Sequence, residues 1–270
     1  MLSIHKTAIV GEDVSLGDGS KIGAYATVEN GVSIGHGTTI GEHAIVRSGT
    51  VIGNGSLIDS FAVIGGIPQD ISFDVNLTSG VAIGDNTSVR EYATVHRSAV
   101  EFGTTMVGSN CMLQSGTHVA HDCEVGDGAV IASTSILGGK VKLGKKCFIG
   151  GGAAVHQDVT IGEYAILAGT CAASLDIPPY TIAAGDSLVI GINLIALHRA
   201  DIPAENISAL RNCFREFYVR TGPFSERAKS MLAEGYGKFE ETEKFLNFFL
   251  RNSKRGFAHK RCKIFSHESE

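Results

Sequence analysis

Aliphatic residues recur at every sixth position over most of the first 167 residues. The register runs through positions 4–64, shifts by one residue at Ile83, and continues through positions 107–167. A period of six differs from the 3.6-residue period of a helix and from the simple alternation of an ordinary strand, so the repeat is itself the structural unit. Residues two positions before each aliphatic one are mostly small or β-branched. This pattern predicts a mainly β fold, a parallel β-helix with three short strands per coil of 18 residues.

In such a coil, residues 18 apart become vertical neighbours at the strand spacing of about 4.8 Å, and the aliphatic residues stack inside. The register breaks twice. Residues 66–80 are expected to form a loop outside the solenoid, and residues 97–105 a smaller protrusion, because Glu101 occupies an aliphatic slot. Loops on a rigid repeat scaffold often carry binding groups.

The hexad pattern fades after position 167, and residues 176–180 are expected to close the solenoid. From residue 188 the apolar spacing becomes three and four, which predicts helices near 190–199, 203–220, 224–234 and 238–252. The predicted organisation is thus a β-helix domain over 1–187 and a helical C-terminal domain over 188–270, which would cover the open edge of the solenoid. The basic stretch 254–263 is expected to be a solvated tail, with a role towards an acidic partner left open.

Composition narrows the function classes. The 34 glycines among 270 residues follow the repeat, and the net charge of −5 gives no reason to expect nucleic-acid binding. Six cysteines without a CxxC pair, and no N-terminal signal pattern, indicate a reducing, cytoplasmic setting. The longest apolar run, residues 188–197, is shorter than the roughly 20 residues that span a bilayer, so no transmembrane helix is expected.

The candidate chemistry lies in the polar segment 116–123. Asp122, Lys140 and Asp158 are successively 18 apart and should form one vertical column, with His121 at its foot and His156 two coils up. An imidazole that titrates near neutrality can act as a general base, and a neighbouring carboxylate can orient it. The pattern therefore favours direct transfer in which His121 deprotonates an acceptor hydroxyl.

Two other chemistries fit the sequence less well. Cys123 is interpreted as a small hydrophobic core residue rather than a nucleophile. A zinc site of the kind that trimeric β-helices hold between subunits needs two histidines about five apart and a third two coils earlier. Here His118 and His121 are three apart, and Ala82 stands 36 residues before His118. No metal site and no cofactor are predicted.

An ordered set of motifs extends over nearly the whole chain. They are the loop Ile-Gly-Gly-Ile-Pro-Gln-Asp at 64–70, the run 83–91, His-Val-Ala-His-Asp-Cys at 118–123, the pair at 156–157, Asp-Ile-Pro-Pro-Tyr at 176–180, and Gly-Ile-Asn at 191–193 with Arg199. Together these motifs resemble one family, the cytoplasmic UDP-N-acetylglucosamine O-acyltransferases that start lipid A biosynthesis.

The resemblance implies a left-handed β-helix, an exception to the usual right-handed crossover. It also implies a homotrimer with active sites between neighbouring solenoids, and transfer of a 3-hydroxyacyl chain from acyl carrier protein to the 3-hydroxyl of UDP-N-acetylglucosamine. By position, His121 would be the general base and Asp122 its orienting partner. The substrate-binding positions carried over are Asp70 at the sugar, His118 and His156 in the cleft, Gln157, Asn193 and Arg199 at nucleotide or pantetheine contacts, and Gly169 at the limit on acyl length. Gln69 and Lys140 are further substrate-binding candidates.

Several positions depart from the family pattern: Lys140 replaces His, Asp158 replaces Phe, Ser133 and Thr134 replace two Asn, Ser72 replaces Lys, and Ala200 replaces a second Arg. One hypothesis is that Lys140 pairs with the carboxylates above and below it in a charge ladder. Alternatively, Lys140 supplies a cation near a pyrophosphate. Two other functions stay open: a paralogue that acylates another nucleotide sugar at O or N, and a catalytically silent binding or scaffold protein.

Overall fold

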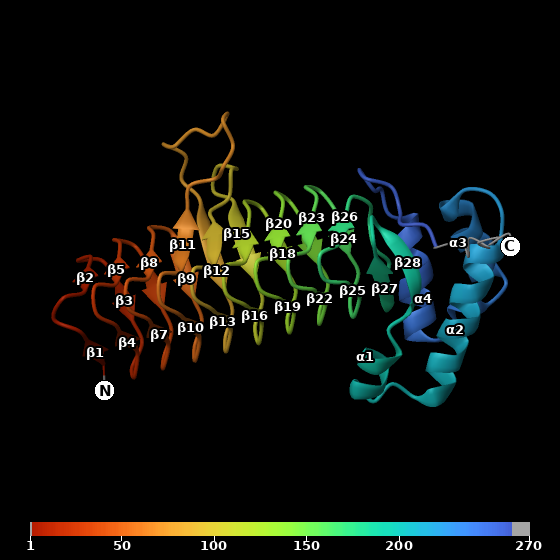
Figure 1. Cartoon of the computed structure of the whole chain (residues 1–270), viewed down its shortest axis with the longest axis horizontal. Coiled ribbons are helices and arrows are strands. Elements are labelled where there is room, and N and C mark those ends of the chain that lie inside the picture. The colour runs from red at the N-terminus through yellow and green to blue at the C-terminus, as the bar shows by residue number, and fades with distance from the viewer. Residues whose placement is uncertain (1, 261–270) are drawn as a thin grey trace, which may run out of the picture.

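The computed structural model describes residues 2–260. It is a left-handed parallel β-helix of three sheets that run the length of a triangular prism, followed by helices at its C-terminal end (Figure 1). Up to β26, consecutive strands belong to different sheets, and strands three places apart pair in parallel. The last two strands depart from this rule, because β27 pairs with β25 and, antiparallel, with β28. The prediction of 18-residue coils is confirmed by the register, because His118 pairs with Ile136 and Val119 with Leu137.

The first sheet has the order β1-β4-β7-β10-β13-β16-β19-β22-β25-β27-β28. Its strands are β1 Ser3–Ile4, β4 Lys21–Ile22, β7 Thr39–Ile40, β10 Leu57–Ile58, β13 Ser88–Val89, β16 Met112–Leu113, β19 Val130–Ile131, β22 Phe148–Ile149, β25 Ile166–Leu167, β27 Thr181–Ala184 and β28 Leu188–Ile192.

The other two sheets complete the prism. The second contains β2 Ile9–Val10, β5 Thr27–Val28, β8 Ile45–Val46, β11 Val63–Gly66, β14 Thr94–His96, β17 His118–Val119, β20 Ile136–Leu137, β23 Ala154–Val155 and β26 Ala172–Ala173. The third contains β3 Ser15–Leu16, β6 Ser33–Ile34, β9 Thr50–Ile52, β12 Gly80–Ile83, β15 Thr104–Val107, β18 Glu124–Val125, β21 Lys142–Leu143 and β24 Thr160–Ile161.

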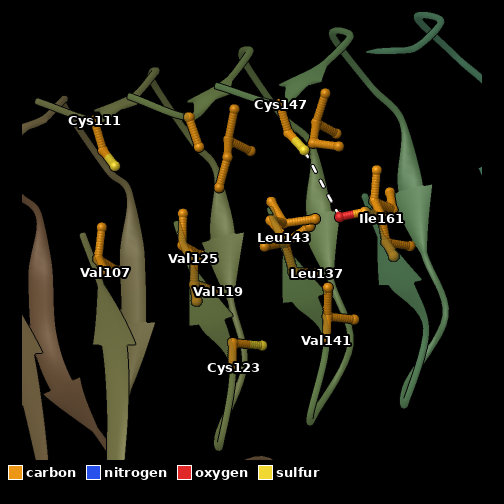
Figure 2. Packing of buried hydrophobic residues seen from close by; sticks show 14 of the residues in the cluster. Val107, Cys111, Val119, Cys123, Val125, Leu137, Val141, Leu143, Cys147 and Ile161 are labelled. Carbon is orange, nitrogen blue, oxygen red and sulfur yellow. Dashed lines mark hydrogen bonds between the residues drawn. The ribbon is translucent and has the colours of Figure 1, made fainter. Parts of the chain in front are cut away.

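The interior is the stack of aliphatic residues that the hexads predict. Val119, Leu137 and Val155 follow one another up the second sheet and are at most 3% exposed. Small residues, Cys123 among them, occupy the narrow corners (Figure 2). The thiol of Cys123 donates to the carbonyl of Gly138. Burial raises the pKa of the Cys123 thiol to about 12, which suits a core residue and not a nucleophile.

Two segments leave the solenoid where the hexad register breaks. Residues 67–79 connect β11 to β12 as a projecting loop, and residues 97–103 connect β14 to β15 (Figure 1). The 97–103 segment leaves one coil before the turn that follows β17, and the 67–79 loop leaves two coils before it. They therefore bring chain from outside the repeat towards the polar segment 116–123.

The C-terminal part differs from expectation at its start. Residues 188–192 form β28, antiparallel to β27, where a helix was predicted from about residue 190, because a short apolar run does not distinguish a strand from a helix. The helices that follow are α1 Leu194–Arg199, α2 Ala204–Val219, α3 Phe224–Ala233 and α4 Glu240–Asn247, with 3-10 turns η1 Tyr236–Lys238 and η2 Phe248–Leu250. Within residues 2–260 no helix combines the length and apolar character needed to cross a membrane.

The chain after η2 does not form the solvated tail that its basic composition indicated. Arg251 and Ser253 bind the carboxylate of Asp176, which is 1% exposed, and Lys254 pairs with Asp158 at 2.9 Å. Ala258 is fully buried. The segment therefore packs back onto the last coils as far as residue 260, and the rest of the predicted tail lies outside the described residues.

Candidate functional site

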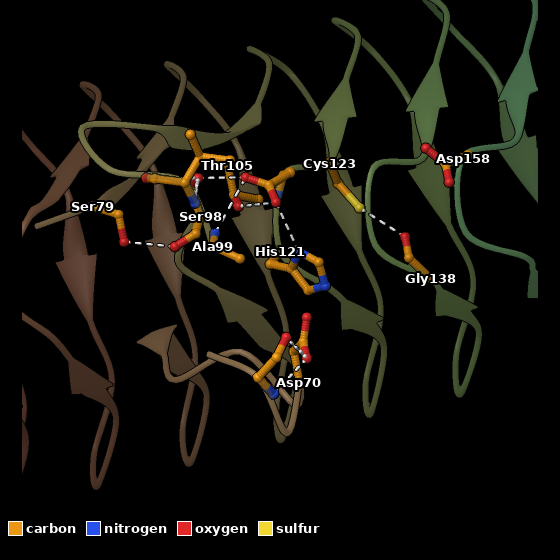
Figure 3. Close-up of polar contacts among 12 residues, drawn as sticks. Asp70, Ser79, Ser98, Ala99, Thr105, His121, Cys123, Gly138 and Asp158 are labelled. Carbon is orange, nitrogen blue, oxygen red and sulfur yellow. Dashed lines mark hydrogen bonds and ion pairs between the residues drawn. The ribbon is translucent and has the colours of Figure 1, made fainter. Parts of the chain in front are cut away.

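His121 and Asp122 occupy the turn that leads from β17 in the second sheet to β18 in the third. Nδ1 of His121 lies 2.8 Å from Oδ2 of Asp122 (Figure 3). Asp122 adopts the left-handed backbone region with φ 61, and its amide donates to Oγ1 of Thr105 at 2.8 Å. Their side chains are only 19% and 14% exposed. A carboxylate at Nδ1 favours the tautomer that carries its proton there, so Nε2 is left as the acceptor.

The turn one coil above approaches that acceptor closely and leaves room only for the imidazole itself. A β-carbon added to Gly139 would lie 2.6 Å from Nε2 of His121 and 2.7 Å from its Cε1. Gln157 occupies the equivalent position one coil further on, and its backbone lies against Gly138. The absence of a side chain at Gly139 thus lets the imidazole adopt its place beneath the next turn.

The projecting loop supplies a carboxylate on the open side of the imidazole. Asp70 and His121 face the same space, one from the loop and one from the turn (Figure 3). Oδ1 of Asp70 accepts hydrogen bonds from the hydroxyl and the amide of Ser72, at 2.7 and 2.9 Å. These bonds, with smaller contributions from the charges of His121 and Lys140, lower the pKa of Asp70. Gln69 is exposed beside it.

Arg97 ties this loop to the solenoid. Its guanidinium donates to the carbonyls of Leu77 at 3.0 Å and Val75 at 2.8 Å, and it lies over the ring of Phe73 at 5.1 Å. Because Arg97 directly follows β14, it fixes the loop against the same coil that precedes His121.

Two further histidines line the second sheet beside His121. Nδ1 of His118 lies 2.7 Å from Oγ1 of Thr94, and the His118 ring meets the ring of His96 edge-on at 4.7 Å. Burial lowers the pKa of His118, and burial together with the neighbouring histidines lowers the pKa of His96 to about 4. Both rings are therefore neutral near pH 7, and they shape the site without adding charge.

The predicted column of Asp122, Lys140 and Asp158 is present in the backbone. The amide of Lys140 donates to the carbonyl of His121, and the amide of Asp158 to that of Gly139, each at 2.9 Å. The predicted charge ladder, however, is wrong. Asp122 pairs with His121, Asp158 pairs with Lys254, and Lys140 has no ion pair within 4 Å among residues 2–260. All three line a cavity of about 550 Å³ that also borders Lys254.

The remaining predicted residues are spread over the upper coils. His156 is exposed, with Nδ1 3.2 Å from the carbonyl of Gln157, which is exposed as well. Gly169 lies one coil above Gly151, and a β-carbon there would come within 3.2 Å of the Gly151 carbonyl. At these two stacked glycines no side chain projects from the backbone.

Asn193 and Arg199 lie on a different face of the prism. Asn193 is 3% exposed and caps α1, because its Oδ1 accepts from the amide of Ala196 at 3.2 Å while its Nδ2 donates to the carbonyl of Tyr164 at 2.7 Å. With Arg199 it borders a groove of about 550 Å³ over Phe148 in the first sheet. Within one chain, the structure brings together His118, His121, Asp122, Asp70 and Lys140 but not Asn193 and Arg199.

Sequence reasoning missed Ser98, Thr105, His96 and Gly139. The hydroxyl of Ser98 binds Oδ1 of Asp122, although the two residues are 24 apart and not 18. The six extra positions belong to the 97–103 segment, so the stacking rule could not find this pair. The one visible signal was the glycine doublet 138–139. The equivalent turns one coil below and one coil above carry polar side chains at the position of Gly139, His121 and Gln157.

Comparisons with known proteins agree on one family. The family model described as "Udp N-acetylglucosamine O-acyltransferase; Domain 2" matches residues 176–258. The model of the bacterial transferase hexapeptide repeats matches residues 104–139. The acyl-[acyl-carrier-protein]–UDP-N-acetylglucosamine O-acyltransferase of Aquifex aeolicus is 52% identical over 95% of this chain and 98% of its own, and that of Sulfurihydrogenibium is 52% identical over 96% and 95%.

A solved structure supports the same conclusion. The UDP-N-acetylglucosamine acyltransferase from Campylobacter jejuni has a TM-score of 0.89 at 35% identity, covering 96% of this chain and all of that one. With relatives at this identity over nearly the full length of both chains, the protein belongs to the family of acyl-[acyl-carrier-protein]–UDP-N-acetylglucosamine O-acyltransferases.

Proposed function

We propose that the protein transfers a 3-hydroxyacyl chain from acyl carrier protein to the 3-hydroxyl of UDP-N-acetylglucosamine, the first step of lipid A biosynthesis, with His121 as the general base. The observation that carries this proposal is the His121–Asp122 pair. The carboxylate holds Nδ1 at 2.8 Å, while Nε2 faces the space between Gly139 and the loop that carries Asp70.

The chemistry follows from that geometry. Nε2 of His121 takes the proton from the sugar hydroxyl as its oxygen attacks the thioester carbonyl. The new ester C–O bond forms, the C–S bond breaks, and the imidazolium returns the proton to the departing thiolate of the pantetheine arm. Asp122 stabilises the imidazolium during the reaction, so no covalent enzyme intermediate and no cofactor are needed.

Binding roles can be assigned from charge and position. Asp70 and Gln69 would receive the sugar, since the carboxylate of Asp70 is fixed by Ser72 and faces His121. Lys140 is exposed and near enough to Asp70 to lower its pKa, which suits contact with an anionic part of the nucleotide sugar. Neutral His118 and exposed His156 would line the cleft, and Gly169 would leave the acyl groove open.

The separation of Asn193 and Arg199 from His121 supports a homotrimer in which each site is shared between neighbours. A groove over Phe148 and Arg199 that faces the next subunit's His121 would complete the nucleotide or pantetheine contacts with Gln157. This arrangement predicts subunit complementation. His121→Ala and Arg199→Ala trimers should each lose most activity, and trimers mixed from both should recover part of it. No recovery after mixing would indicate a site contained in one chain.

Five described cysteines, Cys111, Cys123, Cys147, Cys171 and Cys213, are free, which fits the reducing cytoplasmic setting proposed for the enzyme.

The direct test uses purified full-length protein, UDP-N-acetylglucosamine and 3-hydroxyacyl carrier proteins of several chain lengths, with the product identified by mass spectrometry. An ester product is cleaved by hydroxylamine, whereas an amide formed on a 3-amino analogue of the sugar survives. Turnover to the ester supports the proposal. Turnover only with the amino analogue favours an N-acyltransferase, and no turnover with any donor favours another nucleotide sugar or a silent scaffold.

A further inference from the structure

The segment between β14 and β15 lies behind the carboxylate of Asp122, on the side away from His121. Ser98 is fully buried, and its hydroxyl binds Oδ1 of Asp122 (Figure 3). The amide of Ala99 donates to the same oxygen at 3.3 Å. Two donors therefore engage Oδ1, and Oδ2 is left for Nδ1 of His121.

The direction of the Ser98 hydroxyl proton is set by its other neighbours. The amide of Val100 donates to Oγ at 3.0 Å, so the oxygen already serves as an acceptor. Among residues 2–260 the one other acceptor near the proton is the carbonyl of Val100 at 3.4 Å, and Asp122 Oδ1 is much closer. Ser98 thus donates its proton to the carboxylate.

The surrounding backbone holds Ser98 in place. Its carbonyl accepts from the hydroxyl of Ser79 at 2.6 Å, and its amide donates to the carbonyl of Gly80 at 3.3 Å. A β-carbon on Gly103 would lie 2.2 Å from the Ser98 oxygen. The segment therefore has to carry glycine at 103 for the hydroxyl to reach Asp122.

We propose that Ser98 is a positioning residue that acts through Asp122: by occupying Oδ1, it stops the carboxylate from rotating and presents Oδ2 to His121. This inference rests on the proposed role of His121 as the base. A hydrogen bond to an ionised carboxylate is stronger than one between neutral groups. With Asp122 fixed in this way, the Nδ1–H tautomer of His121 is maintained and Nε2 stays aimed at the acceptor hydroxyl.

The test is a double-mutant cycle in the acyl-transfer assay, with Ser98→Ala, Asp122→Ala and the double variant of the full-length protein. We expect Ser98→Ala to lower kcat by about 10-fold with little change in KM, from the usual strength of a hydrogen bond to a charged group. In the Asp122→Ala background the same substitution should have no further effect. Ser98→Cys, which keeps a weaker donor, should fall between serine and alanine.

Ser79→Ala is the matched control, since it loosens the same segment but leaves the Ser98 hydroxyl in place. Its kcat should stay within about two-fold of the parent, on the usual modest effect of one neutral hydrogen bond. An unchanged kcat in Ser98→Ala and Ser98→Cys would overturn the inference, and so would an equal loss in both backgrounds of the cycle. If Asp122→Ala itself left kcat unchanged, the proposed function would fail rather than this inference alone.

Discussion

A β-carbon on Gly139 would lie 2.6 Å from Nε2 of His121, in the column of turns that Gln157 continues one coil higher. The atom proposed to accept the substrate proton is therefore covered on one side by a glycine, and this contact depends on a single missing methyl group. Because the repeat puts residues 18 apart in register, it is the repeat that brings Gly139 against the proposed base His121.

Gly139→Ala should disable catalysis without unfolding the protein. The three heavy atoms nearest the added methyl all belong to the imidazole of His121, at 2.6 to 3.3 Å, so the ring has to move and its 2.8 Å bond to Asp122 is broken or bent. We expect kcat/KM to fall by 10-fold or more, on the order of the loss that a misplaced base causes. Gly191→Ala, where an added methyl meets nothing within 4 Å, is the control and should keep parental activity and melting temperature.

The return of the C-terminal segment onto the solenoid can be tested through Asp176. This carboxylate is 1% exposed and binds Arg251, Ser253 and the amide of Thr160. Asp176→Asn would leave Arg251 without its partner, and we expect a loss of about 3 kcal/mol in the free energy of unfolding. Urea denaturation measures this loss of stability. The exposed pair of Lys254 with Asp158 is the contrast, and Lys254→Ala should lose less than about 1 kcal/mol.

His96 predicts a specific loss of stability in acid. Burial lowers its pKa from 6.5 to about 4 in the folded protein, so between these values the unfolded chain binds the proton more readily. The contribution of neutral His96 to the free energy of unfolding is therefore complete above pH 6.5 and is lost as the pH falls towards 4. At pH 4.5 the folded state should be destabilised by about 2 kcal/mol through this residue. The stability difference between parent and His96→Gln should shift by that amount between pH 7 and pH 4.5, and a pH-independent difference would contradict it.

Ser72 should act on substrate affinity rather than on the chemical step. It donates two hydrogen bonds to Asp70, one from the hydroxyl and one from the amide, and alanine keeps only the second. A less fixed Asp70 should raise the KM for UDP-N-acetylglucosamine about three- to ten-fold with kcat within two-fold, from the modest net contribution of one solvent-exposed hydrogen bond. A fall in kcat at constant KM would place Asp70 at the reacting atoms instead.

The sequence predicted those features of the site that obey the repeat. A period of six residues with three strands per coil puts Asp122, Lys140 and Asp158 in one column, and the backbone hydrogen bonds agree. The projecting loop could be located because the aliphatic register breaks at residue 65 and resumes one position out of phase. In both cases a local regularity determines the position.

The contacts that escaped prediction are those made by irregular segments. Ser98 reaches Asp122 across an insertion that changes the spacing to 24, and Lys254 reaches Asp158 across 96 residues with no period at all. The charge ladder failed for this reason, since the column could be predicted but not the competing partner from the C-terminal segment. The role of Asn193 as a helix cap could not be predicted either, because it depends on where β28 ends.

The central claim, that His121 is the general base, is tested most directly by the kcat/KM of His121→Ala for acyl transfer to UDP-N-acetylglucosamine, with the circular dichroism and oligomeric state of the variant matched to the parent. Loss of a positioned base typically slows a reaction by about 10²- to 10⁴-fold, and we expect a fall in that range. A variant that retains kcat/KM within three-fold of the parent would contradict the account.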